Sequence, residues 1–242
     1  MSVAERFTAA VSADADAFPE VELLPVRLAR ACVRVLPVAG AGLSAMADPD
    51  LRLPIGASDD VAGFVERLQF TYGEGPCLQA YRTGQPQMIP AWELASRWPE
   101  MNRDLTAVTP YRAVASVPLL DGATRLGALD LYLEQPAGLD PMDRRAAFTV
   151  AACISQALVS ARIFTVAAQR ADPTPGADGH TDPMASRIQV WKAMGLLNVE
   201  LKVTAPDALA LLRAHAYATE RLVDDLALDI VTRRIPVAEL RP

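Results

Sequence analysis

Residues 113–133 read AVASVPLLDGATRLGALDLYL, and this stretch decides the fold class. Two strongly apolar runs, Ala113 to Leu120 and Leu126 to Leu133, flank an Asp121-Gly122 pair. An Asp-Gly pair between two such runs is a signal for a tight turn that joins antiparallel strands. The stretch therefore predicts a β-hairpin.

Working outward from the hairpin, helix and strand signals alternate along the chain. A long helix is predicted after it, at residues 141–170, about 45 Å long at about 1.5 Å per residue. Residues 92–105 are expected to be a loop with a helical piece. The earlier predicted elements are helices at 21–36 and 59–69 and strands at 39–46, 51–55 and 87–89.

Three short motifs accompany this pattern: Gly73-Glu74-Gly75-Pro76-Cys77, Thr83-Gly84-Gln85-Pro86 and Leu126-Gly127-Ala128-Leu129-Asp130-Leu131-Tyr132. In order and spacing, over roughly residues 20–165, the chain resembles the GAF domain. The resemblance implies an α+β fold, with an antiparallel sheet of about six strands and flanking helices, that binds small ligands or dimerises. We therefore expect an N-terminal extension at 1–19 and a GAF-like sensory or dimerisation domain at 20–168.

The sequence excludes several GAF ligands, and we expect no cofactor. Both histidines, His180 and His215, lie outside the front domain, so it has no imidazole for haem iron. Cys77 is followed by Leu78, not the histidine typical of a bilin site, and the motif of cyclic-nucleotide GAF domains is absent. The three cysteines are too far apart in sequence for metal-ligand spacing. What remains is a pocket for an unidentified small molecule, or no ligand; candidate lining residues, each equally compatible with a structural role, are Trp92, Tyr111, Arg112 and Asp130.

Cys77 has two interpretations. It follows Gly75-Pro76 at a predicted helix start, where the helix dipole favours a thiolate and so a redox sensor. The alternative, which we favour, is a small buried hydrophobic side chain beside the sheet.

The last part of the chain is predicted to be a separate helical unit. Residues 169–184 contain prolines and glycines that break a helix and indicate a flexible linker. Residues 185–236 show apolar spacing typical of three short helices that pack on one another. Thr204 and Asp207 predict an N-cap with an acidic partner for the second helix, with Pro206 in its first turn.

These helices resemble the ANTAR domain, a three-helix RNA-binding module of bacterial antitermination regulators. The resemblance rests on Ala193-x-Gly195-Leu196, Ala208-x-x-Leu211-Leu212-Arg213-x-x-Ala216 and Asp225-Leu226-Ala227-x-x-Ile230-Val231. It implies binding to paired hairpins in nascent RNA, and the two halves together resemble the GAF–ANTAR regulators of actinobacteria. Glu220 stands where many relatives have glycine, and Leu222 where they often have a Ser or Pro, so the entry to the third helix is expected to be either looser or capped differently.

Charge adds little to the RNA prediction. Residues 184–242 hold eight Lys/Arg and seven Asp/Glu, a net charge of +1, whereas residues 1–183 carry −7. RNA loops are read through Arg planes, phosphate contacts and stacked aromatic rings. The candidate RNA-binding residues, which are also compatible with ordinary solvated side chains, are Arg187, Lys192, Arg213, His215, Tyr217 and Arg221.

The first functional prediction is therefore a non-enzymatic, cytoplasmic antitermination regulator controlled by its GAF-like domain. The alternative is a GAF-type sensor whose helical tail binds DNA or a protein. No nucleophile elbow, phosphate loop or metal motif favours an enzyme. The chain has no apolar stretch of the length that spans a membrane. Apolar residues of the long helix beyond what one sheet face covers suggest a homodimer; they are Phe148, Val150, Ile154, Leu158, Ile163, Phe164 and Val166.

Overall fold

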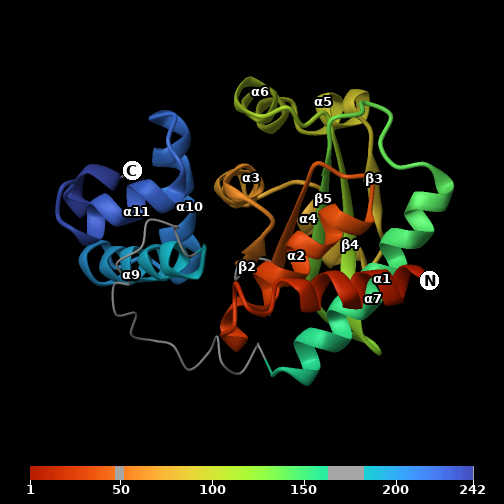
Figure 1. Ribbon diagram of the computed structural model, residues 1–242. Coiled ribbons are helices and arrows are strands. Elements are labelled where there is room, and N and C mark those ends of the chain that lie inside the picture. The colour runs from red at the N-terminus through yellow and green to blue at the C-terminus, as the bar shows by residue number, and fades with distance from the viewer. Residues whose placement is uncertain (47–51, 163–182, 242) are drawn as a thin grey trace.

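A five-stranded antiparallel sheet forms the centre of the front domain in the computed structural model, which describes residues 1–46, 52–162 and 183–241 (Figure 1). The strand order is β2-β1-β5-β4-β3, so the expectation of about six strands is corrected to five within the described ranges. The strands are β1 (Gly40–Met46), β2 (Arg52–Ala57), β3 (Gln87–Ile89), β4 (Ala113–Asp121) and β5 (Thr124–Leu133).

The predicted hairpin is confirmed as β4 and β5, which pair along their whole length. Gly122 has a φ of 57°, the left-handed conformation that the tight turn requires. Since successive residues of a strand point to opposite faces, the register partners Val117 and Leu129 face one layer of helices. The neighbouring partners Ser116 and Asp130 face the other layer.

One face of the sheet is covered by α1 (Val3–Ala13), η1 (Val21–Leu23) with α2 (Leu24–Val35), and α7 (Pro141–Ser160). Residues 1–19, predicted as an N-terminal extension, contain the helix α1, which buries Phe7 in the core of this layer. Its signal was the capping box of Ser2 and Glu5. The long helix predicted to run to residue 170 ends at Ser160, and residues 163–170 lie outside the described part.

The opposite face carries α3 (Asp60–Tyr72), α4 (Pro76–Thr83), α5 (Ala91–Arg97) and α6 (Pro99–Val108). The expected loop over residues 92–105 is thus two helices, the second with proline in its first turn. The apolar contacts of this layer include Leu68 of α3 and Leu105 of α6, packed with the sheet residues Val114 and Tyr132.

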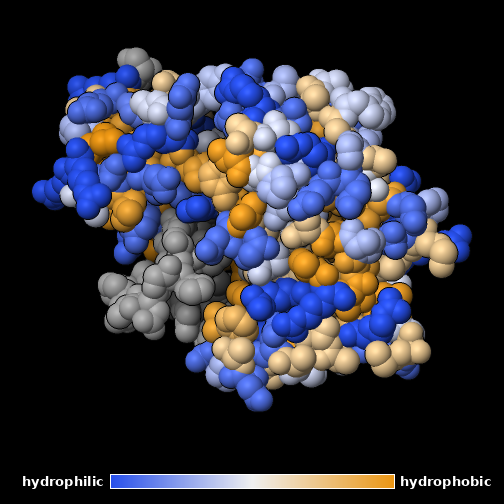
Figure 2. Space-filling view, turned by 45° about the horizontal axis from the view of Figure 1, so that its top comes forward, coloured by the Kyte–Doolittle hydropathy of each residue, from blue (hydrophilic) through white to orange (hydrophobic). Residues whose placement is uncertain are grey.

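The C-terminal unit consists of α9 (Pro183–Leu201), α10 (Ala205–Ala218), α11 (Val223–Val231) and η2 (Val237–Leu240). The predicted cap of α10 is confirmed: Thr204 and Asp207 form a capping box. Most of the predicted linker falls on residues outside the described part. The unit lies beside α3 (Figure 1), and Figure 2 shows hydrophilic residues over much of its visible face.

The turn between α10 and α11 has a backbone conformation that favours glycine at position 220. Glu220 has a φ of 52°, in the left-handed region where glycine is favoured and other residues are strained. Leu222 is the N-cap of α11, and its side chain makes no capping hydrogen bond. The start of α11 must therefore be stabilised by another group.

Fewer apolar side chains of α7 are exposed for a dimer contact than the sequence predicted. Val150, Ile154 and Leu158 are fully buried within this chain, because α7 packs on β4 and beneath α1. Phe148 is 41% exposed, and the residues expected beyond Ser160 lie outside the described ranges. A homodimer therefore stays a prediction, with fewer apolar residues available to it.

Candidate functional site

A buried polar network lies between the sheet and the α3–α4 layer. The strands place its members by alternation: Ser44 on β1, Ser116 on β4 and Asp130 on β5 interrupt otherwise apolar runs on the same face. The helix α3 contributes Glu66 and Gln69, which are also buried. The remaining members are Arg52, Cys77 and Tyr132.

Glu66 is the centre of this network. Its carboxylate accepts hydrogen bonds from the Ser44 hydroxyl at 2.7 Å and the Tyr132 hydroxyl at 2.5 Å. Arg52 donates to the same carboxylate and, at 2.7 Å, to the main-chain carbonyl of Glu66. Arg52 Nε is also buried but has no hydrogen-bond partner among the described atoms.

Asp130 is the second carboxyl group of the network. It accepts hydrogen bonds from Ser116 and, at 3.0 Å, from Gln69, and it lies 3.6 Å from the Arg52 guanidinium. Burial and then the nearby charge of Glu66 raise the pKa of Asp130 to about 7, against the opposing effect of Arg52. This buried group can therefore change its protonation state close to neutral pH.

Cys77 sits at the start of α4, where Gly75, with φ 133°, and Pro76 turn the chain into the helix as predicted. Its main-chain N–H donates to the Gln69 side chain at 3.3 Å. Burial raises the pKa of the Cys77 thiol well above its usual value and outweighs the lowering effect of Arg52. A fully buried, protonated thiol favours the interpretation of Cys77 as a small buried side chain.

The structure does not bring the four candidate pocket residues together. Asp130 is in the network, and Tyr111 stacks on Tyr132 with ring centroids 5.0 Å apart, so these two are linked through one ring. Trp92 is 72% exposed on α5. Arg112 donates to main-chain carbonyl groups at the start of β4, including that of Tyr111 at 2.7 Å.

The network members that sequence reasoning missed are Ser44, Arg52, Glu66, Gln69, Ser116 and Tyr132. A signal existed for the two serines, because each interrupts an apolar strand run and lies on the same face of the sheet as Asp130. No local signal could have paired Arg52 with Glu66, since their contact depends on how β2 and α3 pack.

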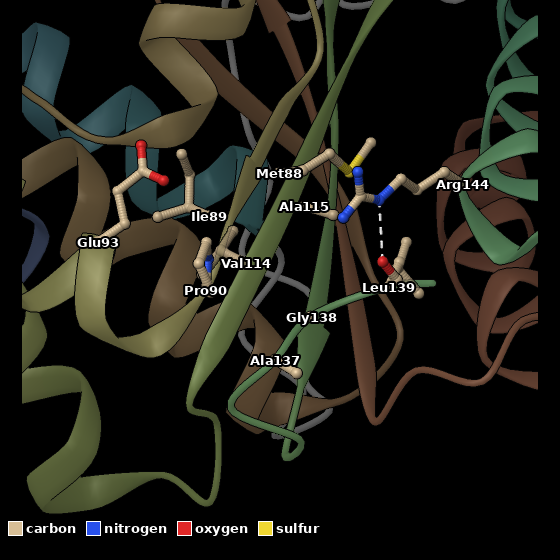
Figure 3. Close-up of a pocket in the computed structure, with 10 residues that line it drawn as sticks. All are labelled: Met88, Ile89, Pro90, Glu93, Val114, Ala115, Ala137, Gly138, Leu139 and Arg144. Atoms are coloured by element: carbon tan, nitrogen blue, oxygen red, sulfur yellow. Dashed lines mark hydrogen bonds between the residues drawn. The ribbon is translucent and has the colours of Figure 1, made fainter. Parts of the chain in front are cut away.

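A separate cavity of about 180 Å³ opens at the β3 edge of the sheet (Figure 3). Met88 and Ile89 of β3 and Val114 and Ala115 of β4 form much of its lining. Arg144 reaches it from α7 and donates to the Leu139 carbonyl at 2.9 Å. It shares no residue with the buried polar network, so the two are independent features of the domain.

The sheet order, the two helical layers and the Gly-rich start of α4 together match one known family. The sequence model of the GAF domain matches residues 22–159, more than half of the chain. The chain belongs to the GAF domain family. The buried network is therefore the polar interior of a GAF domain, and GAF domains commonly sense small molecules. The matched region ends before α9 begins.

Several solved structures are similar to this chain at low sequence identity. The GAF domain of a phosphoenolpyruvate-protein phosphotransferase from Coxiella burnetii is 14% identical with a TM-score of 0.49, covering 68% of this chain and 99% of its own. The corresponding Acinetobacter domain is 12% identical with a TM-score of 0.49 and coverages of 69% and 99%. A free methionine-R-sulfoxide reductase from Neisseria meningitidis, solved with its substrate, is 16% identical with a TM-score of 0.47, covering 66% and 90%. Comparison with curated proteins gives no match.

The helical tail docks on α3 of the GAF domain. Phe70, at the end of α3, is buried in the apolar core of the tail together with residues such as Leu209 and Leu212. Arg213 of α10 donates from Nε to the Phe70 carbonyl at 3.1 Å, and its guanidinium lies 4.9 Å from the Phe70 ring centroid. The main-chain N–H of Val223 donates to the Thr71 hydroxyl at 3.1 Å.

The six candidate RNA-binding residues do not form one patch. Arg213 and Tyr217, four residues apart, share the face of α10 that meets α3, and Tyr217 packs edge-on against Tyr72 with ring centroids 6.2 Å apart. Arg221 is near them but pairs with Asp229 at 2.5 Å. His215 is half-buried and lies about 200° around α10 from Arg213, at about 100° per residue.

The remaining two candidates are on α9. Lys192 is exposed there. Arg187 belongs to the same helix, but its side chain lies outside the described part. The residues of the ANTAR resemblance are mostly packing residues, since Ala193, Leu212 and Ala227 are fully buried, with Ala208, Ala216, Leu226 and Ile230.

Two further properties hold for the described part of the chain. No group of three or more His, Cys, Asp or Glu side chains there is arranged to hold a metal ion. None of its helices combines the length and the hydropathy that crossing a bilayer requires.

Proposed function

We propose that this protein is a signal-responsive regulator whose GAF domain controls an RNA-binding helical tail, with transcription antitermination as the output. The proposal joins family membership, shown for the GAF domain, to the ANTAR-like motifs on α9, α10 and α11. An unidentified small molecule is the proposed signal, and the partner is RNA with paired hairpins.

Gly195 is the observation that most supports RNA binding by the tail. It lies within α9, where glycine costs about 1 kcal/mol relative to alanine. Apart from the adjoining backbone of α9, no described atom lies within 4 Å of a Cβ placed there, so packing among the described residues gives no reason for the glycine. A glycine on an open helix face permits close approach of a partner backbone. Lys192, one turn earlier, is exposed and offers a cation to a phosphate.

The low net charge of the tail favours binding to folded RNA through a few cationic side chains and not through an extended positively charged surface. The tail has a net charge of only +1, and Arg221 and Arg234 are paired with Asp229. Few cations remain for phosphates, so affinity must rest on a few contacts and on shape. Single-stranded loops of RNA hairpins suit this, because their bases can stack on exposed rings such as Tyr217.

A filter-binding titration of the full chain with an RNA of two adjacent hairpins tests the function, with duplex DNA of equal length as competitor. Lys192→Ala should weaken RNA binding by about tenfold, the effect of one charge-assisted hydrogen bond. Lys202→Ala, which removes the same charge from the residue that follows α9, is the matched control and should change RNA binding little.

The outcomes separate the candidate functions. Equal affinity for RNA and duplex DNA would favour the DNA-binding alternative. No binding to either nucleic acid would favour a tail that binds a protein. Equal losses in Lys192→Ala and Lys202→Ala would mean that only net charge is sensed.

A further inference from the structure

The last two turns of α3, residues 66–72, pack against both the interior of the GAF domain and the helical tail. On its sheet-facing side, Glu66 and Gln69 are held in the buried polar network. On its other side, Phe70 enters the core of the tail and its carbonyl accepts the hydrogen bond from Arg213. One rigid helix therefore touches both the polar interior of the GAF domain and the docked bundle.

Thr71 completes the start of α11. The first amides of a helix lack partners within the helix, and a capping side chain normally accepts from one of them. Leu222 offers no such side chain, and the Thr71 hydroxyl of the GAF domain accepts from Val223 N–H in its place. The different capping expected for the third helix thus comes from the other domain.

The docked face overlaps the predicted RNA-binding face. Arg213 is held by Phe70, and Tyr217 packs on Tyr72. Tyr217 and Arg221 also line a hollow of about 730 Å³ between α3, α6 and the α10–α11 turn. Three of the six candidate RNA contacts therefore lie at the contact with the GAF domain.

We propose that α3 holds the tail in a closed state in which Arg213 and the side of Tyr217 that packs on Tyr72 are withheld from RNA. The GAF domain and RNA compete for this face of α10. A signal that shifts α3 at Glu66 and Gln69 moves Phe70 and Thr71 with it and so releases the tail. The inference rests on the proposed function and adds the means of its regulation.

Thr71→Val in the full chain tests this without altering the tail. It removes the acceptor of Val223 N–H and the intrahelical bond from the Thr71 hydroxyl to the Arg67 carbonyl. Thr149→Val is the matched control, because exposed Thr149 on α7 makes the same intrahelical bond, to Arg145, on the opposite face of the sheet. Amide hydrogen exchange of Val223 reports docking, and filter binding to the two-hairpin RNA reports release.

The expected result is faster exchange at Val223 and about three- to tenfold tighter RNA binding in Thr71→Val, as loss of one hydrogen bond implies. Thr149→Val should match the unaltered chain in both measurements. A second variant, Arg213→Lys, keeps the charge but loses the Nε donor to Phe70, and it should also speed exchange at Val223.

The other outcomes overturn different parts of the proposal. If amide exchange at Val223 is unchanged in both Thr71→Val and Arg213→Lys, the closed state is overturned. Faster exchange with unchanged RNA affinity overturns the competition while leaving the proposed function intact. No RNA binding by any of these proteins overturns the proposed function, and the competition with it, whatever the exchange shows.

Discussion

Gln69 donates a hydrogen bond to Asp130 at 3.0 Å, joining the end of α3 to the middle of β5 inside the GAF domain. The residue after Gln69 is Phe70, which lies in the core of the tail. The Gln69 side chain and one peptide bond therefore connect Asp130, whose pKa is about 7, to Phe70 in the core of the tail.

Asp130 should make folding stability depend on pH. Its folded-state pKa, about 7, lies above its ordinary value of 3.8, so between these two pH values the folded state binds more protons than the unfolded state. The stabilisation from this group is fully present below about pH 4 and is lost as pH rises through about 7. Urea unfolding at pH 5.5 and pH 8 should show a lower free energy of unfolding at pH 8, by on the order of 1–2 kcal/mol.

Asp130→Asn is the control for that measurement, because it keeps the shape of the side chain and removes the titration. The difference between pH 5.5 and pH 8 should shrink in this variant. The same decline in both proteins would show that another group causes it.

Glu220→Gly should stabilise the protein. The residue has a φ of 52°, and glycine relieves a cost of about 1 kcal/mol while adding back some unfolded-state entropy. We expect a net gain of about 0.5 kcal/mol in urea unfolding. Glu220→Gln separates charge from backbone conformation and should leave stability unchanged; an equal gain in both variants would point to the charge.

Gly195→Ala should raise stability and weaken RNA binding together. Alanine is favoured over glycine in a helix by about 1 kcal/mol, and its Cβ meets no described atom. The same Cβ would stand between α9 and an approaching RNA backbone. Gly63→Ala in α3 is the matched control, since its Cβ would make an ordinary 3.7 Å contact with Ala57; it should stabilise the chain without changing RNA affinity.

Cys77 should resist alkylation in the folded protein. Its thiol is buried and burial raises its pKa, so little thiolate is available to iodoacetamide at pH 8. Peptide mass spectrometry should find Cys153, which is partly exposed, modified first and Cys77 modified only in urea. Rapid labelling of Cys77 in the native chain would restore it as a redox candidate.

Local patterns predicted most of the elements, though not α1 or the two helices α5 and α6, and they did not predict the contacts between elements. The β4–β5 hairpin and the Thr204 cap were predictable because their signals lie within a few residues. The contact of Phe70 with Arg213 spans 143 residues of sequence, and no periodicity links the two.

Of the buried polar network, the sequence singled out only Asp130, as a candidate pocket residue, and Cys77, as a redox candidate. An amphipathic pattern shows that a short helix has a buried face but does not show whether an aromatic residue such as Trp92 lies on it. The partners of Asp130 come from elements separated in sequence, and the pairing of Arg52 with Glu66 depends on their packing.

The capping of α11 by Thr71 places the structural boundary of the tail inside the front domain. Transplanting residues 183–241 onto another sensor would leave the Val223 amide without its acceptor and the bundle core without the Phe70 ring. A chimera that is meant to keep the tail intact must therefore also carry residues 70–73 of this chain. The recipient sensor would have to be redesigned at the surface that packs on the tail, as well as at the point where the two chains are joined.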